Sequence, residues 1–311
     1  LKGDDAAKAL LEEARSRLNG DPLRNALAAF YLQPGRAGSG SVEFAHKSFG
    51  EFLCAERIKE SLADWAQPGI RRQEFYIPTE QMDWELYDLL GFGGLTPEIV
   101  EYLAASLDLC SEQFCAENIV RLFKRLEQFY VRWCEGEFID APPENLPQKK
   151  MRLLKEQLPN REKPLGQRQV DVYTGLNVMI LLLELHRYAQ NRDDLKDQII
   201  FYPSGQLAEG ERYTKWLLQI IHYSDCLDFE TFSRVAGFFL SSANLYSANL
   251  DSANLSSANL SSANLSSANL DSANLSSANL SSANLYSAYL DSANLYSANL
   301  SSAYLSSANL S

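Results

Sequence analysis

The sequence predicts an α + β protein, in which a mostly α-helical N-terminal region is followed by a solenoid of short repeats. The first observation is that fourteen consecutive copies of one five-residue pattern fill residues 242–311 without an insertion. The second is that residues 1–239 contain long stretches with apolar side chains at helical spacing. With 46% hydrophobic and 22% charged residues, the 311-residue chain has an ordinary globular composition.

The charge balance argues against two classes of partner. The chain has 28 Lys and Arg against 40 Asp and Glu, a formal net charge of −12, so its surface repels phosphates at long range. Its longest apolar stretch, 178–183, is far shorter than the roughly 20 residues that span a bilayer. No secretory signal is present in residues 1–10. We expect no nucleic-acid binding, no membrane segment and a cytoplasmic location.

Each repeat reads Ser-Ala-Asn-Leu-x, where x is Ser, Tyr or Asp, and its Asn is replaced only by Tyr289 and Tyr304. A period of five fits neither regular element. Successive leucines on an α-helix would advance by roughly 140° and spread over its surface, and on a flat strand they would alternate between faces. A turn at every repeat, supplied by the small Ser and Asn, places each Leu and Ala on one side. The repeats therefore predict a solenoid with a Leu and Ala interior.

This A-N-L-x-x pattern over the last 70 or so residues closely resembles the pentapeptide-repeat family. The resemblance implies a right-handed quadrilateral β-helix with four repeats, and hence twenty residues, in each coil. Outward residues twenty apart should then stack in columns. Asp251, Asp271 and Asp291 share one such column, and Tyr246 and Tyr286 share another.

These columns predict a surface for a ligand or protein partner. A column of carboxylates would bind a cation or a basic partner, although the same aspartates could serve solubility alone. Tyrosines cluster in the last coils, and exposed tyrosine is enriched in binding hot spots, although it could equally stack between coils. The candidate partner-binding residues are Asp251, Asp271, Asp291, Tyr286, Tyr289, Tyr296 and Tyr304.

Both ends of a β-helix expose unpaired backbone groups that must be covered. The segment 228–232 is expected to open a capped helix that ends near Gly237 and covers the first coil. In this segment Val235, Phe238 and Leu240 fall in the register of the later Leu and Ala positions. The other end simply stops at Ser311, so we expect the native chain to continue or an end-to-end homodimer to form there.

Helical periodicity, Asp caps and Pro at first turns predict a series of helices in residues 1–239. They are expected at 4–18, 21–32, 47–63, 79–90, 96–108, 111–134, 148–158, 167–190, 193–201 and 209–223. A short strand is expected at 41–45. Five cysteines and three histidines show no metal-ligand spacing, so no metal site is predicted.

The Gly-rich segment 35–40 has the G-x4-G spacing of a phosphate-binding loop, but Ser41 and Val42 follow it. A Walker A loop needs Lys and then Ser or Thr at those places, to reach phosphate and Mg²⁺. A β-hairpin connection is therefore the better interpretation.

The segment Phe44-Ala45-His46-Lys47-Ser48-Phe49-Gly50-Glu51-Phe52-Leu53-Cys54-Ala55 resembles the motif that closes the winged-helix domain of NACHT-type STAND NTPases. The resemblance implies that residues 1–65 are winged-helix-like, 66–239 a helical domain and 240–311 the β-helix. It also implies that His46 contacts the β-phosphate of ADP in the full-length protein. The P-loop and Mg²⁺-binding motif would lie before Leu1, so ADP, ATP and Mg²⁺ are implied only for an upstream nucleotide domain. No cofactor is expected in these 311 residues.

The sequence thus favours the non-catalytic sensor half of a STAND-type signalling NTPase, whose repeats bind a ligand or protein. The order of winged helix, helical domain and repeats supports this more than any one motif does. Two alternatives are an acidic DNA-mimic that acts on a topoisomerase and a purely structural scaffold. An enzyme acting alone is disfavoured, because no nucleophile motif accompanies His186 or His222.

Overall fold

The structure is a computed structural model that describes residues 32–34, 42–44, 47–70, 74–109, 112–140, 145–157, 166–208 and 211–310. The chain divides into two compact units, one of residues 1–60 and 96–103 and the other of 61–95 and 104–311. The second unit contains both helices and repeats. The boundaries expected at 65/66 and 239/240 stay predictions.

The described part of the first unit begins with a β-hairpin. Strands β1 (Leu32–Pro34) and β2 (Val42–Phe44) pair antiparallel, with Leu32 opposite Phe44. The hairpin expected from the Gly-rich segment and the strand expected at 41–45 are therefore confirmed. Helix α3 (Lys47–Ala66) follows, as predicted, and extends three residues past the expected end at 63.

Two expected helices and one site residue fall outside the described residues. The helix expected at 4–18 lies there entirely, and so does the one at 21–32 except for its last residue, Leu32, which begins β1. His46 also lies outside the described residues.

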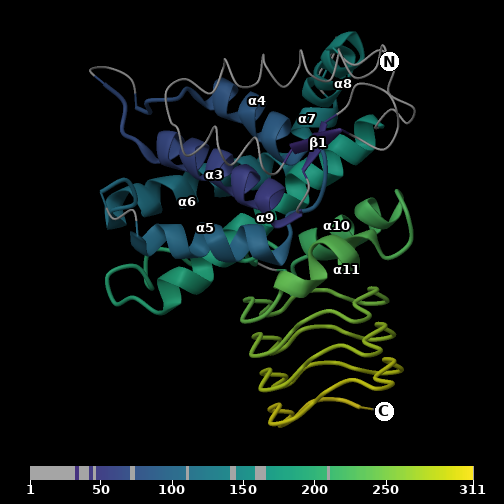
Figure 1. Ribbon diagram of the computed structural model, residues 1–311. Helices are drawn as coiled ribbons and strands as arrows, with labels where there is room; N and C mark the ends of the chain where they lie inside the picture. The colour runs from purple at the N-terminus through teal and green to yellow at the C-terminus, as the bar shows by residue number, and fades with distance from the viewer. Residues whose placement is uncertain are drawn as a thin grey trace. The chain divides into compact units, whose positions relative to one another are not determined.

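Most of the remaining helices agree with the periodicity. Helices α4 (Thr79–Leu90) and α9 (Gln167–Gln190) match their predicted bounds, and α5 (Pro97–Leu109) and α8 (Leu146–Gln157) differ by one or two residues. Helix α6 (Ala116–Cys134) begins five residues later than expected, and the short α7 (Glu137–Asp140) was not expected. Helices α4, α6 and α8 pack against α9, which is buried on nearly all sides (Figure 1).

One expected helix is wrong, and another is shortened. Residues 193–198 form turns, because Arg192 O accepts from the N–H groups of both Leu195 and Lys196 and the next turn restarts at Leu195 O. The aspartates in this segment favour such local turns over a helix interior. The helix expected at 209–223 is α10 (Trp216–Asp225), since residues 211–213 are not helical and Thr214 pairs with the repeats instead.

A buried carboxylate joins four of these helices. Asp171 on α9 accepts hydrogen bonds from Tyr87 Oη on α4 at 2.6 Å, Trp133 Nε1 on α6 at 3.0 Å and Tyr223 Oη on α10 at 3.0 Å. Burial raises the pKa of Asp171, although its three donors act to lower it. Gly175, one turn further along α9, gives the Trp133 ring the space that a side chain would occupy. This cluster fixes α6 and α10 on α9.

The repeats form stacked coils of twenty residues each (Figure 1). Parallel bridges join residues twenty apart, from Asn244 with Asn264 to Tyr289 with Asn309. Backbone bonds of regular register accompany them, as when Leu245 N–H donates to Asn264 O at 2.8 Å and Asn264 N–H donates to Ala243 O at 2.9 Å. Each coil therefore holds four repeats, and single bridges take the place of longer strands.

Serine and asparagine make the turns between repeats. The Ser that opens each repeat has a left-handed backbone, with φ between 51° and 59°. A bond such as Ala263 N–H to Leu260 O, at 3.1 Å, closes each turn. The Asn side chain accepts the N–H two residues ahead, as in Asp271 N–H to Asn269 Oδ1 at 3.0 Å. In several repeats its amide also donates to the Asn of the preceding coil, as in Asn274 Nδ2 to Asn254 Oδ1 at 3.3 Å, although no such bond joins Asn269 to Asn249.

Leucine and alanine fill the interior. From Ala243 to Leu290 every Ala and Leu of the repeats is at most 3% exposed. Burying a leucine side chain contributes about 1.5–3 kcal/mol, so this row of leucines is the main source of the solenoid's stability.

The helical part of the second unit covers the first coil. Thr214 forms a parallel bridge with Ala248, and its carbonyl accepts from Asn249 N–H at 2.7 Å. Arg187, near the end of α9, donates through Nη2 to Phe239 O at 2.9 Å. The predicted capping helix is α11 (Thr231–Val235), which begins three residues later than expected, has no side-chain cap, and contacts the first coil through Ser233 Oγ and Asn254 O.

The predicted register of the cover is wrong at one residue. Val235 and Leu240 are buried as expected, but Phe238 is 57% exposed and Phe239 is buried in its place. A 3₁₀ turn, η1 (Gly237–Phe239), shifts the chain, so that Asn259 N–H donates to Gly237 O rather than to residue 238. Repeats of fixed length begin only after this turn.

Candidate functional site

The coil register sorts the repeats into four stacks. Stack 1 contains the repeats of Leu245, Leu265, Leu285 and Leu305, and stacks 2, 3 and 4 begin with those of Leu250, Leu255 and Leu260. Within a stack, third and fifth positions form outward columns. Stack 4 carries only Ser and Asn at these positions in residues 257–301. The Tyr and Asp residues lie in the other three stacks, so the outer surface of the solenoid is chemically uneven.

Stack 1 carries a tyrosine pair in the last coils. Tyr286 at a fifth position and Tyr304 at a third position are stacked, with ring centroids 6.1 Å apart and planes 15° from parallel. They remain 46% and 55% exposed. Tyr246 lies two coils earlier in the same column as Tyr286 and is also exposed.

Stack 2 combines the aspartate column with one tyrosine. Asp251 is exposed, whereas Asp271 and Asp291 are half-buried. Asp271 Oδ1 accepts the backbone N–H of Asp291 at 2.9 Å, which shows that the two lie in adjacent coils as predicted. At least one of these carboxylates therefore also serves the fold.

Tyr289, also in stack 2, is in contact with the chain itself. Arg212 donates from Nη2 to Tyr289 Oη, and its guanidinium lies 5.2 Å from the centroid of the Tyr289 ring. The same guanidinium lies 5.2 Å from the ring of Tyr213. A cation over a tyrosine face is a favourable arrangement at the surface. Tyr296, in stack 3, is the most open of these tyrosines at 77% exposure.

Two of the tyrosines stand where the fold uses asparagine. Tyr289 and Tyr304 have no amide to donate to the preceding coil and no Oδ1 to accept the N–H two residues ahead. At Tyr289 the loss of the Oδ1 acceptor has a visible effect. The N–H of Asp291 donates to Asp271 Oδ1 in the preceding coil, and not to the side chain two residues before it. The sequence therefore gives up structural hydrogen bonds at these two positions.

The last coil is less buried than the others. Leu290 is 3% exposed, whereas Leu310 is 55% exposed. The end-to-end homodimer expected at this coil stays a prediction, and so do the partner-binding roles of the four tyrosines and three aspartates.

Three further expectations concern metals, membranes and nucleotides. Among the described residues, no three His, Cys, Asp or Glu side chains come close enough to hold a metal ion. In the same part of the chain no helix has the length and apolarity to cross a bilayer. The ADP contact expected for His46 stays a prediction, because that residue is not described.

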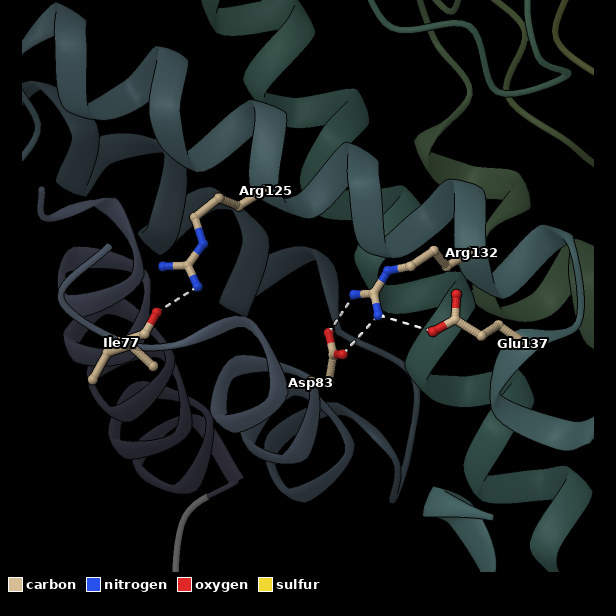
Figure 2. A network of polar contacts seen from close by, with 5 residues as sticks. All are labelled: Ile77, Asp83, Arg125, Arg132 and Glu137. Atoms are coloured by element: carbon tan, nitrogen blue, oxygen red, sulfur yellow. Dashed lines mark hydrogen bonds and ion pairs between the residues drawn. The ribbon is translucent and has the colours of Figure 1, made fainter. Parts of the chain in front are cut away.

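Sequence reasoning missed a charged network on the helical side (Figure 2). Arg132 on α6 binds Asp83 on α4 through two bonds of 2.6 and 2.8 Å, and Glu137 on α7 at 3.3 Å. Earlier on the same helix, the buried Arg125 donates to the carbonyls of Ile77 at 2.6 Å and Trp65 at 2.9 Å. Burial lowers the pKa of Arg125 to about 10. The network fixes α6 against α4 and the segment before it.

The model of the family described as pentapeptide repeats matches residues 240–276 and 273–311, which confirms the repeats but covers less than a quarter of the chain. A comparison with curated proteins finds no match. Among solved structures, one match is HetL, a pentapeptide repeat protein involved in heterocyst differentiation regulation from the cyanobacterium Nostoc sp. strain PCC 7120. It is 39% identical over 22% of this chain and 35% of HetL, with a TM-score of 0.14. The chain thus spans about a third of the length of HetL.

Replacing Tyr289 and Tyr304 by Asn is expected to leave the free energy of unfolding unchanged or to raise it by up to about 1 kcal/mol. The reason is that Asn can again accept the N–H two residues ahead at both positions and, at position 304, donate to Asn284 in the preceding coil, as other copies do in these stacks. These bonds offset the surface contacts that are lost, those of Tyr289 with Arg212 and of Tyr304 with Tyr286. Urea denaturation of the double variant, beside the parent chain, measures the change. A loss of more than about 1 kcal/mol would mean that the two tyrosines serve the fold.

Proposed function

We propose that this chain is a non-catalytic binding module, whose repeats present a protein-binding surface supported by the helical region. The observation that carries the proposal is that Tyr289 and Tyr304 replace asparagines whose counterparts in the same stacks make structural hydrogen bonds, within the repeat for Tyr289 and also between coils for Tyr304. These substitutions lie beside two other exposed tyrosines, Tyr286 and Tyr296, in the last two coils. A sequence that otherwise repeats so strictly gives up hydrogen bonds at these two positions, which favours a role outside the fold.

The partner is proposed to be a protein with a basic contact surface. The repeats carry three carboxylates and no Lys, Arg or His between residues 242 and 311. Within the chain, the guanidinium of Arg212 already lies over the face of the Tyr289 ring. An arginine of a basic partner could contact an exposed tyrosine of this surface in the same way. Tyrosine with arginine is a common hot-spot combination in protein interfaces.

The proposal includes the right-handed quadrilateral form of the coils. Support comes from the four repeats in each coil and from the left-handed serine at every turn. Such a form would give each stack a flat outer side. Tyr286, Tyr289 and the aspartate column would then lie on adjoining sides, where one partner can contact all of them.

A four-residue variant tests the binding surface without disturbing the coils. Each tyrosine is changed to the residue most frequent at its position: Tyr286→Ser, Tyr289→Asn, Tyr296→Ser and Tyr304→Asn. The control changes Ser261, Ser281 and Ser301 of stack 4 to Ala. Proteins from an extract of the source cells are captured on each immobilised chain, and the bound proteins are purified and tested for direct binding.

A direct partner should bind the parent and the control equally and lose at least tenfold in affinity for the tyrosine variant, because the loss of hot-spot side chains costs at least about 1.4 kcal/mol. The same affinity for all three chains would contradict the proposal.

We further propose that the module belongs to a STAND-type signalling NTPase. Support comes from the segment Phe44–Ala55 and from the β1–β2 hairpin, which leads almost directly into α3 as a wing would lead into a helix. Binding at the repeats would then shift the equilibrium of an upstream nucleotide domain. In this proposal His46 donates to the β-phosphate of ADP.

The nucleotide role is tested on the native protein with its upstream sequence. His46→Ala is expected to release ADP that the parent retains through gel filtration, because a phosphate donor is lost. His222→Ala, on the exposed side of α10, is the matched control and should retain ADP. Equal retention by parent and H46A, or absence of any bound nucleotide, would contradict the STAND assignment and leave the binding surface of the repeats untouched.

A further inference from the structure

A cleft of about 550 Å³ opens in the helical part of the second unit and is lined by residues of that part alone. One wall is α6, which contributes Glu127, Gln128 and Val131. The facing wall is the segment of Phe201 and Tyr202, with Trp216 at the start of α10. A volume of this size lies within the roughly 300–1,000 Å³ typical of small-molecule sites.

The aromatic floor of the cleft is fixed in place. The Tyr130 ring meets Phe201 edge-on at 5.2 Å and Trp216 edge-on at 6.4 Å between centroids. Tyr130 Oη donates to Pro203 O at 2.6 Å, which binds the loop to α6. Gly205 has φ +85°, and a side chain there would meet the Trp216 ring at 3.1 Å. The rings therefore form a rigid surface, of which Tyr202 and Trp216 are partly exposed.

Glu127 supplies the charge of the cleft. Its carboxylate is half-buried, and no hydrogen bond or ion pair within the described ranges ends on it. Burial raises the pKa of Glu127, and Lys124 on the preceding turn only partly opposes this. A cation placed beside a half-buried carboxylate stabilises its charged form.

The basic residue that also lines the cleft cannot supply that cation. The guanidinium of Arg132 is already bound to both carboxylate oxygens of Asp83 and to Glu137 (Figure 2). Desolvation lowers the pKa of Arg132, but its hydrogen bonds to Asp83 outweigh this and raise it. Glu127 thus lies beside aromatic rings with only the partial electrostatic support of Lys124.

We infer that this cleft binds a small organic cation, an ammonium or guanidinium group on an apolar or aromatic body. Glu127 pairs with the charged group, the partly exposed rings of Tyr202 and Trp216 contact it and its apolar body, and Gln128 and Gln206 at the rim are placed to accept its remaining N–H groups. Cations placed over aromatic faces beside a carboxylate are recognised in this way.

The experiment compares three probes of similar size and different charge on the full chain: phenethylamine, 2-phenylethanol and 3-phenylpropionate. Isothermal titration measures binding to the parent, to Glu127→Gln and to Glu135→Gln. Glu135 follows α6, is exposed and does not line the cleft, so E135Q changes the net charge without changing the site. Thermal unfolding of both variants checks that they fold.

The amine should bind the parent roughly tenfold more tightly than the alcohol, since one charge-assisted contact is worth about that factor. The propionate should bind weakest. This preference should disappear in E127Q and persist in E135Q. Equal affinity for the three probes, no binding of the amine to the parent, or an unchanged preference in E127Q would each overturn the inference.

Discussion

The rest of the repeat region depends on one constraint, the twenty-residue register of backbone hydrogen bonds between coils. Once Leu245 N–H pairs with Asn264 O, each side chain's neighbours are fixed for the whole solenoid. Leucine and alanine then point inward, and asparagine joins the coils at their outer edges. The same bonds decide which of the variable residues share a column. This register places Asp271 beside Asp291 and Tyr286 beside Tyr304, although each pair is eighteen or twenty residues apart in the sequence.

The helical part of the second unit extends this register at its start. Thr214 takes the place of a residue in a preceding coil, and Arg187 binds the backbone where the repeats begin. Trp216 lies two residues after Thr214. One short segment therefore both lines the cleft beside α6 and pairs, through Thr214, with Ala248 in the first repeat of stack 2. The buried Asp171 holds α10, which begins with Trp216, against α9 and α6. The cleft and the first coil therefore rest on the same fixed elements.

Sequence patterns predicted what local signals determine. The bounds of α4 and α9 follow from apolar periodicity with Pro78 and Gly166 just before them, and the coil register follows from the period of five. The error at Phe238 came from extending that period into a 3₁₀ turn, and the error at 193–201 from reading two successive turns as a helix. The contact of Arg212 with Tyr289 joins residues 77 apart, and the cleft joins α6 to residues 201–216. Such contacts arise from tertiary packing, for which the repeat pattern and helix caps contain no signal.

The coil register is tested most directly by paired cysteines. Ser281→Cys with Ser301→Cys places two thiols in one column of adjacent coils, whereas Ser276→Cys with Ser301→Cys places them twenty-five residues apart in different stacks. Disulfides need Cα atoms within about 4.4–6.8 Å, a spacing that neighbouring coils meet and different stacks do not. Mild oxidation followed by peptide mapping should find the crosslink in the first pair alone. Efficient crosslinking of the second pair, or none in the first, would contradict the register and the surface derived from it.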